Sequence, residues 1–195
     1  VDQFPMNEKS LGKARQLKLV TMTSTGTDFV DFAYINARGI QVSNIRGYST
    51  FSVAQHTVTM LLSLYEHLDF YNSYVKSGAY IGDTANSSFS RSFHDLSGKV
   101  WGIVGLGQIG SQVARIAESF GCEIIYFSPS GNPHSDRYEC VSFETLLAKS
   151  DVISAHAPLS DKTRGIFDVL AFRKMKRDAV LINAARGGLV VEEDL

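Results

Sequence analysis

The sequence predicts an α/β protein with a doubly wound parallel sheet, preceded by part of a second, smaller domain. In the second half of the chain, short apolar runs alternate with segments of helical periodicity. These runs are too short for helices and have the composition of strands buried on both faces. A glycine-rich turn joins the first run to a helical segment. Strands separated by helices in this way pair in parallel through right-handed crossovers.

The first fifty residues predict a smaller unit of the same kind. A strand over residues 17–22 is followed by a polar loop over residues 23–27. A helix over residues 28–38, closed by Gly39, then leads to a second strand over residues 40–42. The polar loop is thereby expected at the carboxyl end of the first strand.

A hinge over residues 44–51 and one long helix over residues 52–76 are expected next. Residues 77–97 show no clear periodicity and predict a covering loop. Within the helix, His56 is expected to be packed and hydrogen-bonded rather than catalytic. The residues at helical spacing are Val53, His56, Thr57, Met60, Leu61, Leu64 and Leu68.

The remaining elements follow a regular order. Residues 100–104, 123–127, 151–155 and 179–182 are the predicted strands, and residues 108–120, 143–149 and 168–175 are the predicted helices. Gly121 is expected to end the first of these helices, and Ser142 to cap the second. The acidic residues Glu192 and Glu193 predict the start of another helix. Because no initiator Met opens the chain and a helix begins at its end, the sequence is expected to be a fragment.

Composition excludes several classes of protein. Hydrophobic residues make up 44% of the 195 residues and charged residues 20%, with a net charge of -1. This balance excludes a disordered chain and gives no reason to expect nucleic acid or an anionic membrane as a partner. No apolar run approaches the roughly 20 residues that cross a bilayer. Two cysteines without metal-ligand spacing predict neither disulfides nor a metal site, so we expect a soluble, cytoplasmic protein.

The segment Gly105-Leu106-Gly107-Gln108-Ile109-Gly110 carries the clearest chemistry. It directly follows a predicted strand and opens a predicted helix, which is the context of dinucleotide-binding turns. There the first glycine permits the turn, the second lets the backbone approach a pyrophosphate, and the third lets helix pack on strand. The alternative is that the glycines serve packing alone.

The next strand bears on the choice of cofactor. An acidic residue commonly binds the adenosine ribose about 20 residues after the glycine turn, but Ser128 occupies this place. A carboxylate would repel a 2′-phosphate, so its absence leaves NAD and NADP both open. Ser128 and Ser130 can bond a hydroxyl or a phosphate, and Arg137 could fold back toward either.

Two more polar clusters follow the later strands, His156-Ala157-Pro158 and Asn183 to Gly188. Ligands of open α/β sheets bind at these strand ends. Arg186 is the stronger candidate, because a guanidinium can hold a carboxylate in two hydrogen bonds and polarise a neighbouring carbonyl. The alternative is a solvated Arg. For His156, capping of the backbone is as good an interpretation as a site role.

Together these segments resemble the D-isomer-specific 2-hydroxyacid dehydrogenases. The resemblance rests on Gly105–Gly110, on residues 146–163 and on residues 175–187, with further similarity at residues 25–28, 38–40, 44–49 and 52–56. The phrase Gly47-Tyr48-Ser49-Thr50 before residues 52–56 favours the glycerate dehydrogenase or hydroxypyruvate reductase branch.

The resemblance implies two domains. Residues 1–52 would be part of a flavodoxin-like substrate domain, and residues 53–195 an NAD(P)-binding Rossmann domain, incomplete at its C-terminal end. It also implies a homodimer through the helix starting near Val53, and the following site. Arg186 would be catalytic, Thr25 and Gly26 would bind substrate, and the cofactor would lie against Gly105, Gly107, Gln108, Ile109, Gly110, Ser128, Ala157, Pro158, Thr163, Ala184, Ala185 and Arg186.

The implied reaction moves a hydride between a nicotinamide and C2 of a 2-hydroxy or 2-oxo acid, such as glycerate, hydroxypyruvate or glyoxylate. The family's acid/base His and its Glu would lie beyond Leu195. Two alternatives stay open. One is a non-catalytic NAD(H)-sensing or corepressor-like protein on the same scaffold. The other is a different dinucleotide enzyme, such as an amino-acid dehydrogenase, which would use a Lys or Asp instead of Arg186.

Overall fold

The computed structural model describes residues 4–82 and 91–195. Contacts within the chain divide it into two compact units, one ending at Ser49 and the other running from Thr50 to Leu195. The domain boundary expected between residues 52 and 53 falls in the first turn of helix α3 (Thr50–Tyr65). Part of the loop expected over residues 77–97 lies outside the described residues.

The first unit contains the predicted strand, helix and parallel strand. These are β1 (Leu19–Thr21), α2 (Phe32–Ala37) and β2 (Gln41–Ser43), and β1 pairs in parallel with β2. The helix starts later than predicted because Asp31 caps it, its side chain accepting a hydrogen bond from the Tyr34 amide at 3.0 Å. A four-residue helix, α1 (Glu8–Leu11), was not predicted. The core of this unit is Val20, Met22, Val30, Ile35 and Ile40.

The second unit opens with two helices instead of the predicted one. α3 ends at Tyr65 and α4 (Leu68–Lys76) begins after His67, whose φ of +48° interrupts the helical backbone. The predicted buried face is also partly wrong, because His56 is exposed. The stripe that packs inward is Ala54, Thr57, Val58, Leu61 and Tyr65.

The sheet of the second unit has five strands in the order β5-β4-β3-β6-β7, all paired in parallel. Four of them were predicted: β3 (Val100–Val104), β4 (Glu123–Phe127), β6 (Val152–Ala155) and β7 (Val180–Asn183). The edge strand β5 (Glu139–Cys140) was not, since two residues carry no periodicity. β4 and β5 lie on one side of β3, and β6 and β7 lie on the other side. This order confirms the predicted doubly wound α/β fold.

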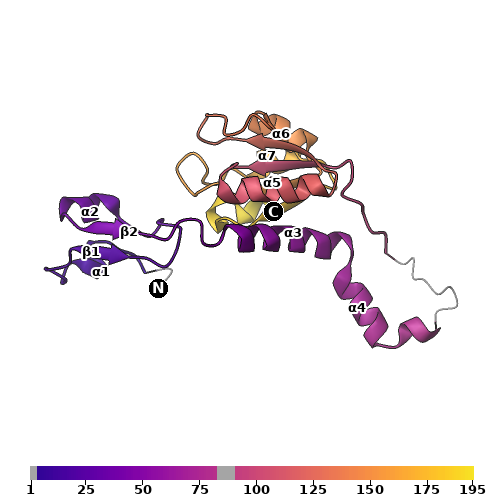
Figure 1. Ribbon diagram of the computed structural model, residues 1–195, viewed down its shortest axis with the longest axis horizontal. Coiled ribbons are helices and arrows are strands. Elements are labelled where there is room, and N and C mark those ends of the chain that lie inside the picture. Colours follow the sequence, from indigo (N-terminus) through magenta and orange to yellow (C-terminus); the bar gives the residue numbers. More distant parts are fainter. Residues whose placement is uncertain (1–3, 83–90) are drawn as a thin grey trace. The chain divides into compact units, whose positions relative to one another are not determined.

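Helices cover both faces of this sheet (Figure 1). α3 and α5 (Gln108–Ser119) pack on one face, and α6 (Phe143–Lys149) and α7 (Val169–Lys174) on the other. Ser142 caps α6 as predicted. A short 3-10 turn, η1 (Ala79–Gly82), follows α4, and two more, η2 (Gly187–Leu189) and η3 (Glu192–Asp194), follow β7. The helix start predicted at Glu192 is therefore a single 3-10 turn.

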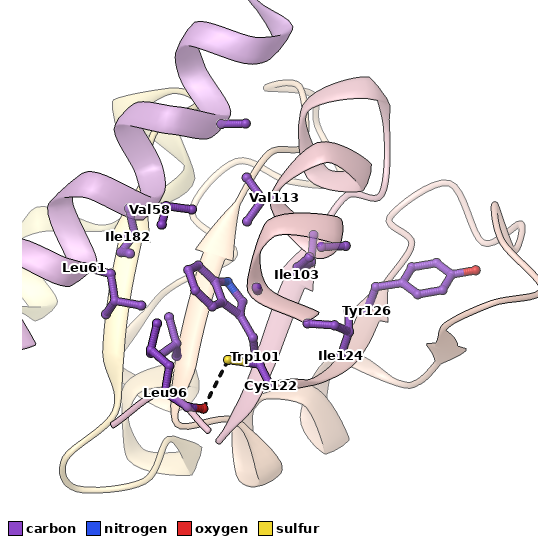
Figure 2. Packing of buried hydrophobic residues seen from close by; sticks show 14 of the residues in the cluster. Val58, Leu61, Leu96, Trp101, Ile103, Val113, Cys122, Ile124, Tyr126 and Ile182 are labelled. Carbon is purple, nitrogen blue, oxygen red and sulfur yellow. Dashed lines mark hydrogen bonds between the residues drawn. The ribbon is translucent and has the colours of Figure 1, made fainter. Parts of the chain in front are cut away.

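Trp101 lies at the centre of the core on the α3 and α5 face. Figure 2 shows Val58 and Leu61 of α3 directed toward it, with Ile182 of β7 nearby. The thiol of Cys122 donates to the Leu96 carbonyl at 3.3 Å, which joins the start of β4 to the segment before β3. Burial, with the charge of Asp151, raises the pKa of this thiol to about 11, so Cys122 is an inert core residue.

Parallel pairing aligns the carboxyl ends of the strands. Val104 is in register with Phe127 on one side and Ala155 on the other, and Ala155 is in register with Asn183. The segments after β3, β4, β6 and β7 therefore emerge at one edge of the sheet. This edge holds most of the predicted site residues. Among the described residues, no helix is both long and apolar enough to span a bilayer.

Candidate functional site

The glycine turn leaves β3 under tight steric constraint. Gly105 has φ +91°, and its amide donates to the Phe127 carbonyl at 2.9 Å. A Cβ at Gly105 would lie 2.8 Å from the amide nitrogen of Ala157. Ala157, a predicted cofactor residue, is thus in van der Waals contact with the turn. Glycine at position 105 is explained by backbone conformation and close packing.

The other two glycines of the turn differ from each other. A Cβ at Gly110 would lie 2.3 Å from the Gly105 carbonyl oxygen, so this glycine lets α5 approach the turn. A Cβ at Gly107 would meet no atom within 4 Å, and Gly107 is exposed with an ordinary φ of -80°. Packing therefore explains the first and third glycines but not the second. The interpretation that all three serve packing fails at Gly107, the position at which a ligand would need a bare backbone.

Helix α5 directs its amino end toward this turn. Gly107 is the N-cap and offers no side-chain acceptor to the first amides of the helix. Because the first amides of a helix have no carbonyl one turn earlier, those of Gln108 and Ile109 are available to an external acceptor. The helix dipole adds partial positive charge at this point. The Gln108 side chain is held aside, since its Oε1 accepts a hydrogen bond from Thr50 Oγ1 at 3.4 Å. The arrangement suits a diphosphate.

Ser128 follows β4 at the same edge and lies buried beside the turn. Its hydroxyl shares a hydrogen bond of 3.0 Å with the hydroxyl of Ser130, which is 3.2 Å from Nε2 of His134. Tyr126 of β4 anchors the loop that carries these residues, because its hydroxyl accepts hydrogen bonds from the amides of His134 and Ser135. The place expected to receive the adenosine ribose therefore carries a pair of hydroxyl groups and an imidazole.

Arg137 is not directed toward Ser128. Its guanidinium binds the carboxylate of Glu118, with Nη2 2.5 Å from Oε2, and Tyr138 contacts the same carboxylate. Glu118 lies in the last turn of α5, the end opposite the glycine turn. The pairing raises the pKa of Arg137, mainly through this hydrogen bond. The suggestion that Arg137 folds back toward the ribose pocket is wrong for this structure.

His156 follows β6 and ends a chain of hydrogen bonds that starts in the core. Trp101 Nε1 donates to Ser154 Oγ at 2.9 Å, and this hydroxyl contacts Nε2 of His156 at 3.0 Å. Nδ1 is shielded from solvent and has no hydrogen-bond partner among the described residues. Burial lowers the pKa of His156 to about 4, so the imidazole is neutral near pH 7. A group with these properties is a poor proton donor.

The segment after His156 forms a closed loop. Pro158 is exposed, whereas Thr163 is buried and its hydroxyl donates to the Pro158 carbonyl at 2.7 Å while accepting from the Ser160 amide at 2.8 Å. Thr163 thus fixes the path of the loop. Of these two predicted cofactor residues, Pro158 is exposed and Thr163 is buried.

Asn183 shapes the loop that carries Arg186. Its side chain accepts from the Ala185 amide at 3.1 Å and donates to the Arg186 carbonyl at 2.8 Å. Ala184 and Ala185 are half-buried, and Arg186 is exposed with Nη1 donating to the Ala185 carbonyl at 2.9 Å. Arg186 therefore stands at the same sheet edge as the glycine turn, with β6 between the strands that lead to them.

Thr25 and Gly26 belong to the first unit, at the carboxyl end of β1. Thr25 Oγ1 donates to the Ile45 carbonyl at 2.8 Å, and Asn44 donates to the Thr25 carbonyl at 2.8 Å. Ser24 donates to the Gly26 carbonyl at 3.0 Å. The loops after β1 and β2 are thus tied to each other, which gives the predicted substrate-binding amides a fixed local geometry.

Two positioning residues were not identified from the sequence, and Asn183 was named only as a member of the polar cluster after its strand. Asn183 holds the Arg186 loop, Ser154 links Trp101 to His156, and Tyr126 anchors the loop after β4. Ser154 and Tyr126 lie in strands that were predicted only as apolar runs. A polar side chain in an otherwise buried strand was the available signal, since such groups need partners.

Comparison with known proteins identifies what this chain resembles. Residues 58–195 match the family described as D-isomer specific 2-hydroxyacid dehydrogenase, NAD binding domain. The whole chain is 36% identical to glycerate dehydrogenase of Methylorubrum extorquens, covering 60% of that protein, and 33% identical to hydroxypyruvate reductase of Blautia hydrogenotrophica, covering 61%.

A solved structure agrees with these matches. D-lactate dehydrogenase of Aquifex aeolicus, in complex with NAD and lactic acid, superposes with a TM-score of 0.86 at 33% identity. The superposition covers 97% of this chain and 56% of that one. The chain thus spans about 60% of the length of the curated relatives named above.

Proposed function

The chain belongs to the D-isomer specific 2-hydroxyacid dehydrogenase family, whose members are NAD-dependent oxidoreductases, and on this premise we propose a function for the complete protein. It interconverts a small D-2-hydroxy acid and the corresponding 2-oxo acid, with glycerate and hydroxypyruvate, or glyoxylate, as the favoured substrates. The similarity to a glycerate dehydrogenase and a hydroxypyruvate reductase supports this choice.

The observation that carries the proposal is the bare backbone at Gly107. A turn whose first and third glycines are needed for packing, and whose second faces open space at a helix amino end, fits a dinucleotide diphosphate. When bound, the nicotinamide would supply or accept the hydride. The amides of Gln108 and Ile109 would hold the diphosphate, and Ser128 would lie at the adenosine ribose. Ala157, Pro158, Ala184 and Ala185 would line the cleft.

Arg186 would hold the substrate. Its guanidinium can bind the carboxylate and polarise the carbonyl at C2, which favours hydride arrival at that carbon. Asn183 would keep the loop in place through its two hydrogen bonds. The amides of Thr25 and Gly26, in the first unit, would contribute hydrogen bonds to a substrate carboxylate.

Proton transfer at the C2 oxygen would not involve His156. That imidazole is neutral, and its Nε2 is occupied by Ser154. We assign the proton to the His and Glu pair that the family resemblance places after Leu195. His56, exposed on α3, has no interaction that would position it for this task among those recorded for the described residues.

Steady-state kinetics of the complete protein test the proposal. With NADH and hydroxypyruvate or glyoxylate, Arg186→Ala should lower kcat/KM by about 10²–10³-fold, the scale for loss of one charge-stabilising group. Arg186→Lys should recover only part, since an ammonium cannot form the paired hydrogen bonds. Arg173→Ala, an exposed Arg on α7, is the matched control. Parental kinetics in Arg186→Ala would refute the role, and tight NADH binding without turnover would support the sensor alternative.

A homodimer through α3 and α4 is part of the proposal. Phe51 and Leu64 of α3 and Leu68 and Val75 of α4 are each more than half exposed, an unusual number of large apolar side chains for a free surface. A groove of about 600 Å³ lies between the helices and includes Met60, Leu64 and Phe70. Sedimentation should show a dimer that Leu64→Glu dissociates, whereas Leu170→Glu on α7 should leave it intact.

A cytoplasmic location is also part of the proposal. The free thiols of Cys122 and Cys140 are consistent with a reducing compartment such as the cytoplasm.

A further inference from the structure

The loop after β4 carries an arrangement that the proposed function has not used. Three side chains form a line from the buried strand end outward: Ser128, Ser130 and His134, with successive separations of 3.0 and 3.2 Å. Ser128 is buried, whereas Ser130 and His134 are exposed. The line therefore begins at the predicted ribose position and ends at the surface.

Hydrogen bonds of backbone amides hold the loop that carries this line. The Gly131 amide donates to the Ser128 carbonyl at 3.0 Å, which closes a turn, and the Asn132 amide lies 3.4 Å from Ser130 Oγ. The amide of His134 donates to the Tyr126 hydroxyl at 2.8 Å, and Tyr126 itself is fully buried in β4. The imidazole is thus carried by a loop anchored in the core.

The imidazole of His134 is the basic group that is hydrogen-bonded to the pair Ser128 and Ser130. No carboxylate is a hydrogen-bond partner of Ser128 or Ser130 in the described part of the chain. Arg137, the next basic residue along the chain, is held by Glu118 at the far end of α5. An imidazole can donate a hydrogen bond when neutral and carries positive charge when it binds a proton.

We infer that His134 is a specificity-determining residue that favours binding of NADP(H). Its imidazole, at the end of the hydrogen-bonded line that starts at Ser128, would donate a hydrogen bond to the 2′-phosphate. This inference rests on the proposed dinucleotide site. A line without a carboxylate does not repel the 2′-phosphate, and the hydroxyl of Ser128 would bind the 2′-hydroxyl of NAD(H). The site therefore admits both cofactors, and His134 strengthens the binding of the phosphorylated one alone.

Calorimetric titration of the chain with NADH and NADPH tests the inference directly. His134→Leu should weaken NADPH binding by about 10- to 100-fold, the range for a hydrogen bond to a charged group. NADH binding should change by less than about 2-fold. The fragments 2′,5′-ADP and 5′-AMP, which lack the nicotinamide, should show the same contrast. Arg137→Gln is the matched control and should alter neither cofactor.

The outcomes separate the inference from the proposed function. Absence of binding by either dinucleotide to the parental chain would refute the proposed site itself. Binding of NADH but not NADPH, or equal losses for both cofactors in His134→Leu, would refute the role of His134 and leave the site intact. A loss confined to NADPH in Arg137→Gln would assign the phosphate contact to Arg137 instead.

Discussion

Replacing Gly107 by Ala separates cofactor binding from folding. An added Cβ would meet no atom within 4 Å, and φ -80° is a conformation that Ala adopts without strain. Ala restricts the unfolded chain, which stabilises by about 0.4–1 kcal/mol, but is a poorer helix N-cap by a similar amount. The free energy of unfolding should therefore change by less than about 1 kcal/mol, or about 2–4 °C in Tm for a chain of this size.

Cofactor binding should respond much more strongly to the same methyl group. The open space at Gly107 is the place where a diphosphate would approach the backbone and the amides of Gln108 and Ile109. Pushing the diphosphate outward lengthens hydrogen bonds to a charged group, each of which contributes about 1.5–3 kcal/mol. We expect the Kd for NADH to rise by at least about 10-fold.

Two measurements on the purified Gly107→Ala protein test this prediction. They are thermal unfolding followed by circular dichroism, and calorimetric titration with NADH. Gly98→Ala is a useful comparison, because a Cβ there also meets nothing within 4 Å but φ is +77°, and Gly98 precedes β3 instead of following it. It should lower Tm and leave NADH binding nearly unchanged. An unaltered Kd in Gly107→Ala would show that the second glycine does not face the cofactor, and the central argument for the site would fail.

Four further substitutions test packing and charge in the second unit. Gly105→Ala should lower stability by about 3 kcal/mol, measured by urea unfolding, because it combines a strained φ with overlap of the Ala157 backbone; a change below about 1 kcal/mol would contradict this. The lowered pKa of His156 predicts that its contribution to stability is fully present above about pH 6.5 and is lost as pH drops toward 4, by at most about 3 kcal/mol. The loss arises because the unfolded chain binds the proton more readily than the folded one. His156→Gln should remove this part of the pH dependence, and an unchanged profile would show that the pKa of His156 is not lowered in the folded protein. Burial alone would raise the pKa of Asp151, but hydrogen bonds from Lys176 and from the Val100 amide lower it. Asp151→Ala should therefore cost about 1–3 kcal/mol at pH 7 and less as pH falls through the folded-state pKa, whereas Lys176→Ala should cost at most about 1 kcal/mol. Equal costs would show that the hydrogen bond from the Val100 amide contributes nothing.

The elements predicted best from the sequence are those with an unambiguous local signal. β3 and β4 were predicted with their observed bounds, because an apolar run of this length is too short for a helix and fits a buried strand. α6 was predicted as well, because Ser142 gives it a capping residue.

Elements determined by tertiary contacts were predicted less well. Nothing local distinguishes His67 from its neighbours, so the break between α3 and α4 was missed. The face of α3 was misjudged at His56 because its stripe is set by packing against α5 and β7. The edge strand β5 exists only because it pairs with β4.

The candidate site was also predicted in part: residues with a local sequence signal were identified, and contacts made by tertiary folding were not. The glycine turn and Arg186 were identified because their spacing relative to the strands is a sequence property. The contact of Ser130 with His134, and the capture of Arg137 by Glu118, depend on how the loop after β4 folds back on the molecule. Such contacts between side chains separated by loops have no periodic signature.

Amide chemical-shift mapping of the 195-residue chain during titration with NADH tests the central claim most directly. The account predicts saturable shifts at Leu106 to Gly110 and at Ser128, with little change around the basic groove that includes Arg15, Lys18 and Arg38 in the first unit. Resonances of the glycine turn that stay unmoved at saturating NADH, or shifts confined to another face of the second unit, would contradict it.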